Sequence, residues 1–303
     1  MVPLRLGARA SRMSLVQTAP LLARLALAGP TLLHPYSGAG GDRRTNRAAL
    51  SEAGVFSDEI ETALLDGDID VAVHCLKDAP THDTPGLTMA AYAARDDIRD
   101  CLVTRDGTGT LDTLPAGATV ATASLRRAAA VRAYRPNLNV TRIRGPVDER
   151  LDTLHDPDIG VDALIVASCS MERLGFTHQI AQRIHPEIIC PPLGAAIIAF
   201  QIREDDPQTR EKLAGLHDPA TAVEAQAERF VLRQMGGYCN APLAGYCSTT
   251  HDTNGRPTYT VRARSLTPDG SAAADVRLTG QDAAATAAAV CRQLQCNRFP
   301  NLR

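Results

Sequence analysis

Lysine is nearly missing from this chain of 303 residues. Lys77 and Lys212 are the only lysines among 32 basic residues, so arginine carries almost all of the positive charge. A biased genomic composition explains this most simply, but it also draws attention to Lys77. The 34 acidic residues nearly balance the basic ones, and the net charge is −2. The overall charge therefore gives no sign of binding to nucleic acid or to a membrane surface.

Long apolar runs and a targeting segment are absent as well. The longest apolar stretches, such as 163–167 and 193–200, are far shorter than the ~20 residues of a membrane-spanning helix. The start of the chain, Met1 to Arg5, does not read as a charged segment followed by an apolar one, as a signal peptide would. We therefore expect a cytoplasmic protein.

The eight cysteines show no CxxC pair and no zinc-like spacing with histidine. In a long cytosolic chain we expect reduced thiols, most of them small apolar core residues. A glycine-rich phosphate loop, an HExxH motif and a Ser/His/Asp order are missing too. The sequence therefore predicts no bound metal, and any reactive cysteine must be identified from its surroundings.

Strand and helix patterns alternate through the first two thirds of the chain. Predicted strands are 4–8, 69–73, 101–104, 119–122, 140–143 and 163–167, and predicted helices include 124–134, 147–155 and 193–202. Such alternation with short connections indicates mainly parallel sheets flanked by helices, and the length favours two sheets. After about residue 217 a helix, three strand-like runs and a final helix indicate a small α+β domain with an antiparallel sheet.

Charged and hydroxyl side chains collect where predicted strands end. Lys77 and Asp78 follow one apolar strand, and the stretches 122–127 and 142–150 each follow a strand and open a helix. Ligands of α/β sheets bind beyond the carboxyl ends of strands. Helix N-termini and arginines both favour carboxylates there. Each stretch alone is also typical of a solvated turn or a charged helix face.

Cys239 lies in a different setting from the other cysteines. It is embedded in the Gly- and Pro-rich stretch 236–245, directly after a predicted helix. A loop of this kind can present sulfur to a ligand, because glycine permits close approach of the backbone. Taken alone, the stretch is equally compatible with a reactive thiol and with a structural turn.

Together these motifs resemble the porphobilinogen deaminase (hydroxymethylbilane synthase) family. The resemblance is carried, in the family's order and spacing, by residues 4–11, 68–81, 124–127, 144–150 and 237–242. It implies an α/β fold with two domains like periplasmic binding proteins and a small C-terminal α+β domain. The implied domains are residues 1–96 with 193–214, residues 97–192, and residues 215–303.

The resemblance also implies the activity. A dipyrromethane cofactor, joined to Cys239 by a thioether, receives four porphobilinogen molecules in turn. Ammonia is lost at each addition, and the linear tetrapyrrole hydroxymethylbilane is released. The implied protein is a transferase of porphyrin and heme biosynthesis that acts as a monomer, without metal, nucleic acid or membrane partners.

Site residues follow from the same resemblance. Asp78 is the expected catalytic group, since a carboxylate can stabilise a cationic pyrrole species and help to move its proton. The expected cofactor-binding residues are Cys239, Lys77, Thr122, Ser124, Arg126, Arg127, Arg144 and Gly145. The expected substrate-binding residues are Arg9, Ser11, Gln17, Arg144, Arg150 and Arg173. Each porphobilinogen brings an acetate and a propionate, and arginine pairs with both through bidentate hydrogen bonds.

Several positions depart from the family's pattern. Ala53 stands where the family has lysine, Pro146 follows Arg-Gly in place of asparagine, and Tyr238 replaces a glycine before the cysteine. Ala123 replaces a serine, and 194–196 reads Gly-Ala-Ala where Gly-Gln-Gly is usual. The main alternative is a homologue that binds tetrapyrroles or small anions without catalysis, and Cys239 and Asp78 argue against it. No helix-turn-helix pattern supports a transcriptional role.

Overall fold

The computed structural model describes residues 2–37, 57–237, 243–270 and 273–296. The chain divides into two compact units, Met1–Asp96 with Gly194–Cys239 and Asp97–Leu193 with Asn240–Arg303. It therefore passes between the units three times. The predicted third domain, residues 215–303, contributes to both units in this division, and its boundaries stay a prediction.

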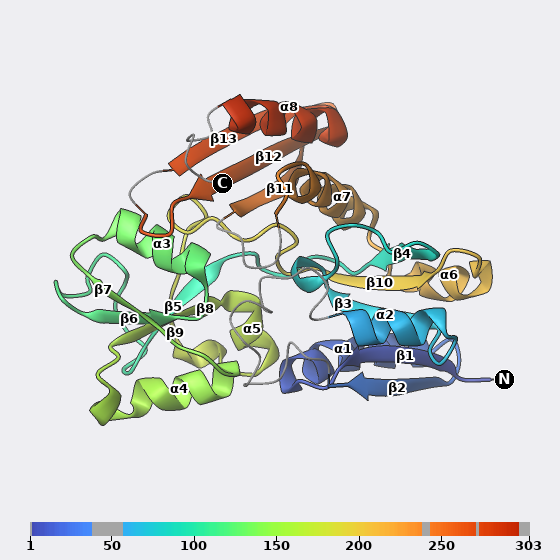
Figure 1. Ribbon diagram of the computed structural model, residues 1–303, viewed down its shortest axis with the longest axis horizontal. Helices are drawn as coiled ribbons and strands as arrows, with labels where there is room; N and C mark the ends of the chain where they lie inside the picture. Colours follow the sequence, from blue (N-terminus) through green and yellow to red (C-terminus); the bar gives the residue numbers. More distant parts are fainter. Residues whose placement is uncertain (1, 38–56, 238–242, 271–272, 297–303) are drawn as a thin grey trace. The chain divides into compact units, whose positions relative to one another are not determined.

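The first unit is built on a five-stranded mixed sheet with the order β2-β1-β3-β10-β4 (Figure 1). Strand β1 pairs in parallel with β2 and β3, whereas β10 is antiparallel to both β3 and β4. The strands are β1 (Leu4–Arg9), β2 (Thr31–Tyr36), β3 (Val71–Cys75), β4 (Leu87–Tyr92) and β10 (Ile198–Arg203). The helices are α1 (Arg12–Ala26), α2 (Asp58–Leu65), α6 (Pro207–Leu213) and α7 (Pro219–Gln234), with 3-10 turns η3 (Leu76–Asp78) and η6 (Ala214–Leu216).

Both faces of this sheet are covered because its central strands are apolar on both sides. On β1, Leu4 and Leu6 pack with Leu25 of α1, and on the other face Gly7 meets Ile60 of α2. A Cβ atom at Gly7 would lie 2.4 Å from Ile69, so only glycine lets α2 and the segment before β3 approach so closely. The predicted central strands are thus fixed by burial.

The second unit repeats this plan in a sheet with the order β7-β6-β8-β5-β9. Three strands run parallel, and β5 is antiparallel to both neighbours. The strands are β5 (Asp100–Thr104), β6 (Thr119–Thr122), β7 (Asn139–Arg142), β8 (Ala163–Ala167) and β9 (Ile180–Arg183). Helix α3 (Leu125–Tyr134) covers one face, and α4 (Val147–His155) and α5 (Ser168–Arg173) cover the other, with short turns η4 (Pro157–Ile159) and η5 (Thr177–Gln179) (Figure 1).

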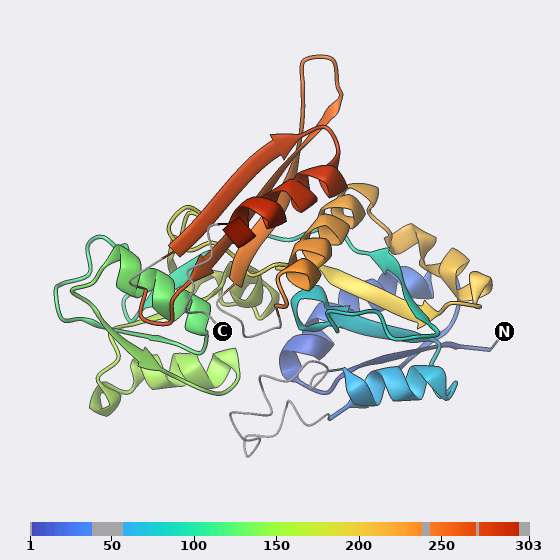
Figure 2. The same ribbon diagram turned by 45° about the horizontal axis from the view of Figure 1, so that its top comes forward.

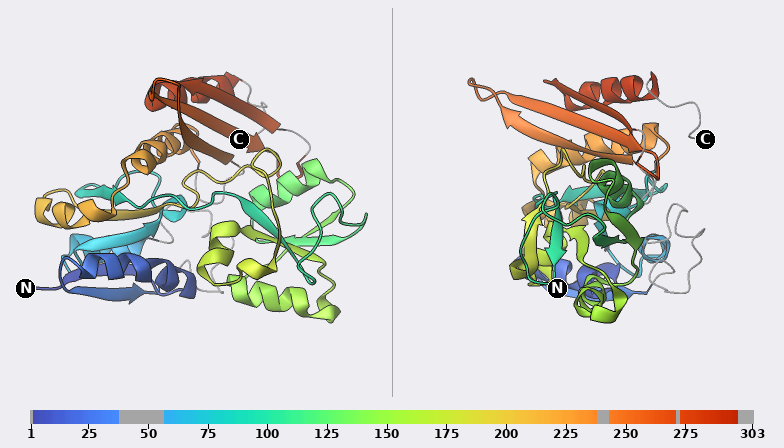
Figure 3. Two further views of the ribbon diagram at one scale, coloured as in Figure 1. Left: turned by 180° about the vertical axis from the view of Figure 1, so that it is seen from behind. Right: turned by 90° about the vertical axis from the view of Figure 1, so that its left-hand side faces the viewer.

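The same unit contains the predicted C-terminal antiparallel sheet. Its strands β11 (Leu243–His251), β12 (Pro257–Leu266) and β13 (Ala273–Gly280) lie in sequence order, and α8 (Ala283–Cys296) packs along one face (Figure 3). The turn of the β11–β12 hairpin projects beyond β13 (Figure 2). The predicted fold class, α/β with two mixed sheets and a small α+β part, is confirmed.

One predicted helix is wrong. Residues 193–202 form a loop followed by strand β10, which is almost fully buried. A short apolar run that is buried on both faces has no periodicity that separates a strand from a helix. Gly194 and Ala196 also have φ of 77° and 61°, which a right-handed helix cannot contain.

Candidate active site

In the first unit, four of the predicted site residues meet at one edge of the sheet. β1 and β3 are parallel neighbours with Gly7 opposite Ala72, so their carboxyl ends coincide. Arg9 ends β1, and Ser11 caps α1 by accepting a hydrogen bond from the Ser14 N–H at 3.3 Å. Lys77 and Asp78 form η3 directly after β3. Gln17, also predicted, is buried in α1.

The loop of Cys239 begins beside the Asp78 segment. Cys239 itself, like Tyr238 and Ala53, lies outside the described residues. Gly237, two residues before the cysteine, accepts a hydrogen bond from Thr81 Oγ1 at 3.3 Å. Thr81 in turn follows Asp78 by three residues. The stretch that leads to the predicted attachment cysteine is therefore held next to the predicted catalytic turn.

Helix α7 anchors the segment that follows Asp78. Arg229 donates to the Pro80 carbonyl at 2.9 Å and to Asp83 at 2.7 Å, and Arg233 binds the same carboxylate at 3.0 Å. Sequence analysis did not identify these arginines, because their partners lie about 150 positions away along the chain. They act on the shape of the turn.

His74 is a buried neutral base next to this turn. Its Nε2 donates to Gln201 Oε1 at 2.9 Å, and Gln201 donates to Glu61 at 2.6 Å. Burial, the largest cause, lowers the pKa of His74 to about 4. The side chain is therefore uncharged at neutral pH and serves as a hydrogen-bond donor in the core.

This histidine should make folding sensitive to moderate acid. Between pH 6.5 and 4 the unfolded chain binds a proton at His74 that the folded chain does not, so the free energy of unfolding falls as the pH falls. A shift from 6.5 to about 4 amounts to about 3 kcal/mol. Urea unfolding of His74→Gln, which keeps a donor for Gln201, should show a loss between pH 7 and pH 4 that is smaller by about this amount. An equal loss in both proteins would contradict the assignment.

In the second unit, the predicted residues again meet where parallel strands end. Thr122 ends β6, and Ser124 caps α3 by accepting from the Arg127 N–H at 3.4 Å. Strand β7 leads to Arg144 and to Arg150 of α4, and β8 leads to α5. Arg173 lies in the last turn of α5. Because β7, β6 and β8 are adjacent and parallel, these groups share one edge of the sheet.

The adjacent arginines are held by an acid that sequence analysis missed. Asp100, 1% exposed, binds Arg126 Nη2 at 2.8 Å and Arg127 Nη2 at 2.7 Å. Arg126 Nη1 also donates to the Cys190 carbonyl. Burial alone would raise the pKa of Asp100, but the two guanidinium groups hold it below its usual value. The Asp100 carboxylate thus fixes both guanidinium groups in place.

The carboxylates described at this edge do not fully neutralise its arginines. Arg127 Nε is buried and has no hydrogen-bond partner among the described residues. Burial and then the charge of Arg127 lower the pKa of Arg150 to about 10, and Asp148 offsets this only in part. A buried donor without a partner and two neighbouring arginines suit an added anion. The donor set fits a ligand that carries carboxylates.

The turn before α4 needs Gly145, which sequence analysis singled out. Gly145 has φ of 108°, and a Cβ atom there would lie 2.8 Å from Glu149 Oε2. Its carbonyl accepts from Arg150 Nε at 3.0 Å. Pro146 occupies the N-cap position without a side-chain cap, where the family's asparagine is a preferred capping residue. The departure therefore removes a helix cap and leaves the arginine turn intact.

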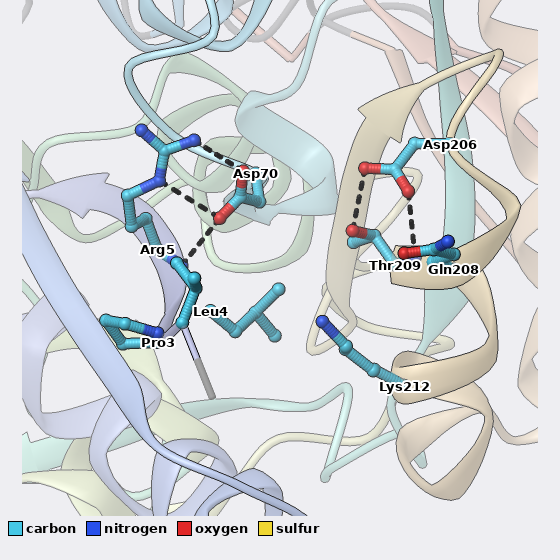
Figure 4. Close-up of a pocket in the computed structure, with 9 residues that line it drawn as sticks. Pro3, Leu4, Arg5, Asp70, Asp206, Gln208, Thr209 and Lys212 are labelled. Carbon is cyan, nitrogen blue, oxygen red and sulfur yellow. Dashed lines mark hydrogen bonds and ion pairs between the residues drawn. The ribbon is translucent and has the colours of Figure 1, made fainter.

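The cavity shown in Figure 4 is separate from both edges. It measures about 200 Å³ and lies at the amino ends of β1 and β3, opposite Lys77 and Asp78. Its Arg5 and Asp70 form an ion pair at 2.7 Å, and its Asp206 caps α6 through Thr209. Lys212, the second lysine, lines this cavity. Its carboxylates are thus satisfied by their own neighbours.

Two features are missing from the described part of the chain. None of its helices has the length and apolar character to span a membrane. None of its groups of His, Cys, Asp and Glu side chains is arranged to hold a metal ion.

Comparisons with known proteins show which family this chain resembles. The family profile "Porphobilinogen deaminase, dipyromethane cofactor binding domain" matches residues 4–211. Porphobilinogen deaminase 2 of Streptomyces coelicolor is 39% identical over 88% of this chain and 85% of its own. The porphobilinogen deaminases of Lachnospira eligens and Streptococcus sanguinis are 37% and 35% identical, over 81% and 96% of this chain and 84% and 95% of theirs.

Solved structures give only a distant likeness. The periplasmic domain of BvgS from B. pertussis aligns with a TM-score of 0.41 at 14% identity, over 75% of this chain and 42% of that one. The family profile and the relatives decide the matter: this chain belongs to the porphobilinogen deaminase family.

Proposed function

We propose that the Asp78 turn of the first unit and the arginine edge of the second unit together carry out the family's reaction. The reaction is hydroxymethylbilane synthesis, the condensation of four porphobilinogens with loss of ammonia. The observation that most supports the site is the Thr81–Gly237 hydrogen bond, which holds the start of the Cys239 loop beside the Asp78 segment. Arg127 Nε, which finds no hydrogen-bond partner within the described part of the chain, supports the anionic nature of the ligand.

The proposed cofactor residues lie in both units. Cys239 forms the thioether, and Lys77, Thr122, Ser124, Arg126, Arg127, Arg144 and Gly145 hold the dipyrromethane carboxylates or shape the turns around them. When bound, the dipyrromethane supplies the pyrrole ring that receives the first substrate. Among the arginines, Arg127 can donate to a carboxylate from its Nε, which has no partner among the described residues. The Nη1 and Nη2 groups of Arg126 already donate to the Cys190 carbonyl and to Asp100.

The proposed substrate residues are Arg9, Ser11, Gln17, Arg144, Arg150 and Arg173. The guanidinium groups bind acetate and propionate carboxylates, and each charged hydrogen bond contributes about 1.5–3 kcal/mol. Burial and then the charge of Arg127 lower the pKa of Arg150 to about 10, so this guanidinium would gain from a further counter-charge. A bound carboxylate would supply it.

Asp78 has the central chemical role. Loss of ammonia leaves a cationic species, and a pyrrole ring that forms the new bond must then give up a proton. The Asp78 carboxylate stabilises the positive charge and accepts or relays the proton. Lys77, adjacent in the same turn η3, binds a carboxylate of the ligand.

The domain organisation and the setting of the enzyme are part of the same proposal. The three predicted domains, a monomeric state, a cytoplasmic location and independence from metal come from the sequence analysis. They remain predictions.

A measurement of turnover distinguishes this function from ligand binding without catalysis. Incubation with porphobilinogen should release one ammonia per porphobilinogen consumed and one linear tetrapyrrole per four. A homologue that only binds tetrapyrroles or small anions would take up the ligand without ammonia release. Addition of a chelator should leave the rate unchanged. Uptake without release of ammonia would overturn the proposal.

A further inference from the structure

A buried glutamate of α7 lies behind the Lys77–Asp78 turn. Glu228, 0% exposed, accepts a hydrogen bond from the Gly194 N–H at 2.6 Å. Arg95 binds the same carboxylate through two nitrogens, at 2.6 and 3.2 Å. A buried acid with a full set of donors is rigidly placed. Neither residue belongs to the arginine or aspartate motifs of the sequence.

Arg95 extends this contact to the residue after Gly194. Its Nε donates to the Ala195 carbonyl at 3.0 Å, and its own N–H donates to Thr221 of α7 at 3.1 Å. A second carboxylate, Glu224, lies 3.3 Å from the guanidinium. The backbone of 194–195, the side chain of Arg95 and helix α7 are thus tied together.

Gly194 transmits this arrangement to the turn. A Cβ atom at Gly194 would lie 2.9 Å from the Lys77 N atom and 3.1 Å from its Cα, so the two backbones are in direct contact. Leu76, which opens the turn, also donates its N–H to the Ile197 carbonyl at 2.9 Å. The 194–197 segment therefore packs directly against the turn.

We propose that Glu228 is a positioning residue for the Lys77–Asp78 turn, acting through Gly194. Together with Arg95 it fixes the 194–197 segment, and that segment fixes the backbone that presents Asp78. The inference rests on the proposed role of Asp78. A misplacement of about 1 Å is enough to lower a rate by about 10²-fold, so a support of this kind has a kinetic effect.

The test compares the two acids that bind Arg95. Glu228→Gln should lower kcat per cofactor-loaded molecule by roughly 10- to 100-fold. The KM for porphobilinogen should stay within about twofold, because the substrate-binding arginines are unchanged. Glu224→Gln, which also removes one partner of Arg95, should leave kcat within about twofold. Of the two acids, Glu228 is the one that accepts from Gly194 among the described residues.

A second pair of variants guards against simple unfolding. Gly194→Ala presses on the Lys77 backbone directly, and its loss of kcat should not add to that of Glu228→Gln in the double variant. If Glu228→Gln does not fold, as judged by circular dichroism, Glu228→Asp keeps a buried negative charge but draws the carboxylate back from the Gly194 N–H. It should show the same loss of kcat.

The inference is overturned if folded Glu228 variants turn over at the wild-type rate, or if KM alone changes. Asp78→Asn is measured in the same series. Should that variant be fully active, the assignment of Asp78 fails. Should Asp78→Asn be inactive while the Glu228 variants are normal, only the positioning role fails.

Discussion

Replacement of Asp78 by asparagine is expected to lower kcat by about 10²- to 10⁴-fold, the range for loss of a group that moves a proton in the transition state. Asparagine keeps the shape of aspartate and removes its charge. The turn should therefore survive, because η3 is held by its backbone and by the 194–197 segment. The check is a steady-state assay of porphobilinogen consumption, with circular dichroism to confirm folding.

A matched control lies five residues further along. Asp83 is also an acid of this segment, but it is 56% exposed at the side chain and paired with Arg229 and Arg233. Asp83→Asn should leave kcat within about threefold, since the Asp83 side chain is mostly exposed and Arg229 keeps its hydrogen bond to the Pro80 carbonyl. A near-normal rate for Asp78→Asn, or equal losses for the two variants, would contradict a specific role of Asp78.

The second large effect is expected at Asp100, this time on stability. Asp100→Asn leaves Arg126 and Arg127 buried side by side without a counter-charge. Removal of one partner from a buried ion pair typically costs about 3–5 kcal/mol. Urea unfolding at pH 7 should show a loss of this size. Because the folded pKa of Asp100 is lowered, its contribution is present above pH 4 and lost as the pH falls through the folded value.

Asp97 provides the comparison for that variant. It pairs with Arg99 at 2.7 Å and with Arg183 at 3.4 Å, and these arginines are 43% and 33% exposed at the side chain. Asp97→Asn should therefore cost about 1 kcal/mol or less. If Asp100→Asn is as stable as Asp97→Asn, the buried carboxylate does not hold the two arginines as described.

Most central strands of the two mixed sheets were predictable, and most of their edge strands were not. β3, β6 and β8 are buried on both faces, so their sequences read as continuous apolar runs. The central strand β10 was predicted as a helix, and the strands β2, β4 and β9, which sequence analysis did not identify, lie at sheet edges. β2 even contains Pro35, which an edge strand tolerates. Half-exposed edge strands show no clear apolar pattern in their sequence. They are recognised only through their pairing with neighbouring strands.

The site shows the same division between local and distant information. Arg126 and Arg127 follow a strand and a capping serine, so a single stretch of sequence reveals them. Asp100, their partner, lies 26 positions away from Arg126 along the chain. Glu228 lies 34 positions from Gly194. Such partners become visible only when the sheet brings their strands and loops together.

Intact mass spectrometry tests the central claim most directly. The purified protein should weigh more than its amino-acid sequence by one dipyrromethane, and porphobilinogen should add further increments of one pyrrole unit. Cys239→Ser should carry no added mass, whereas Cys247→Ser, at a buried position of β11, should carry the full addition. A wild-type protein that has only the mass of its sequence, before and after porphobilinogen is added, would contradict the account.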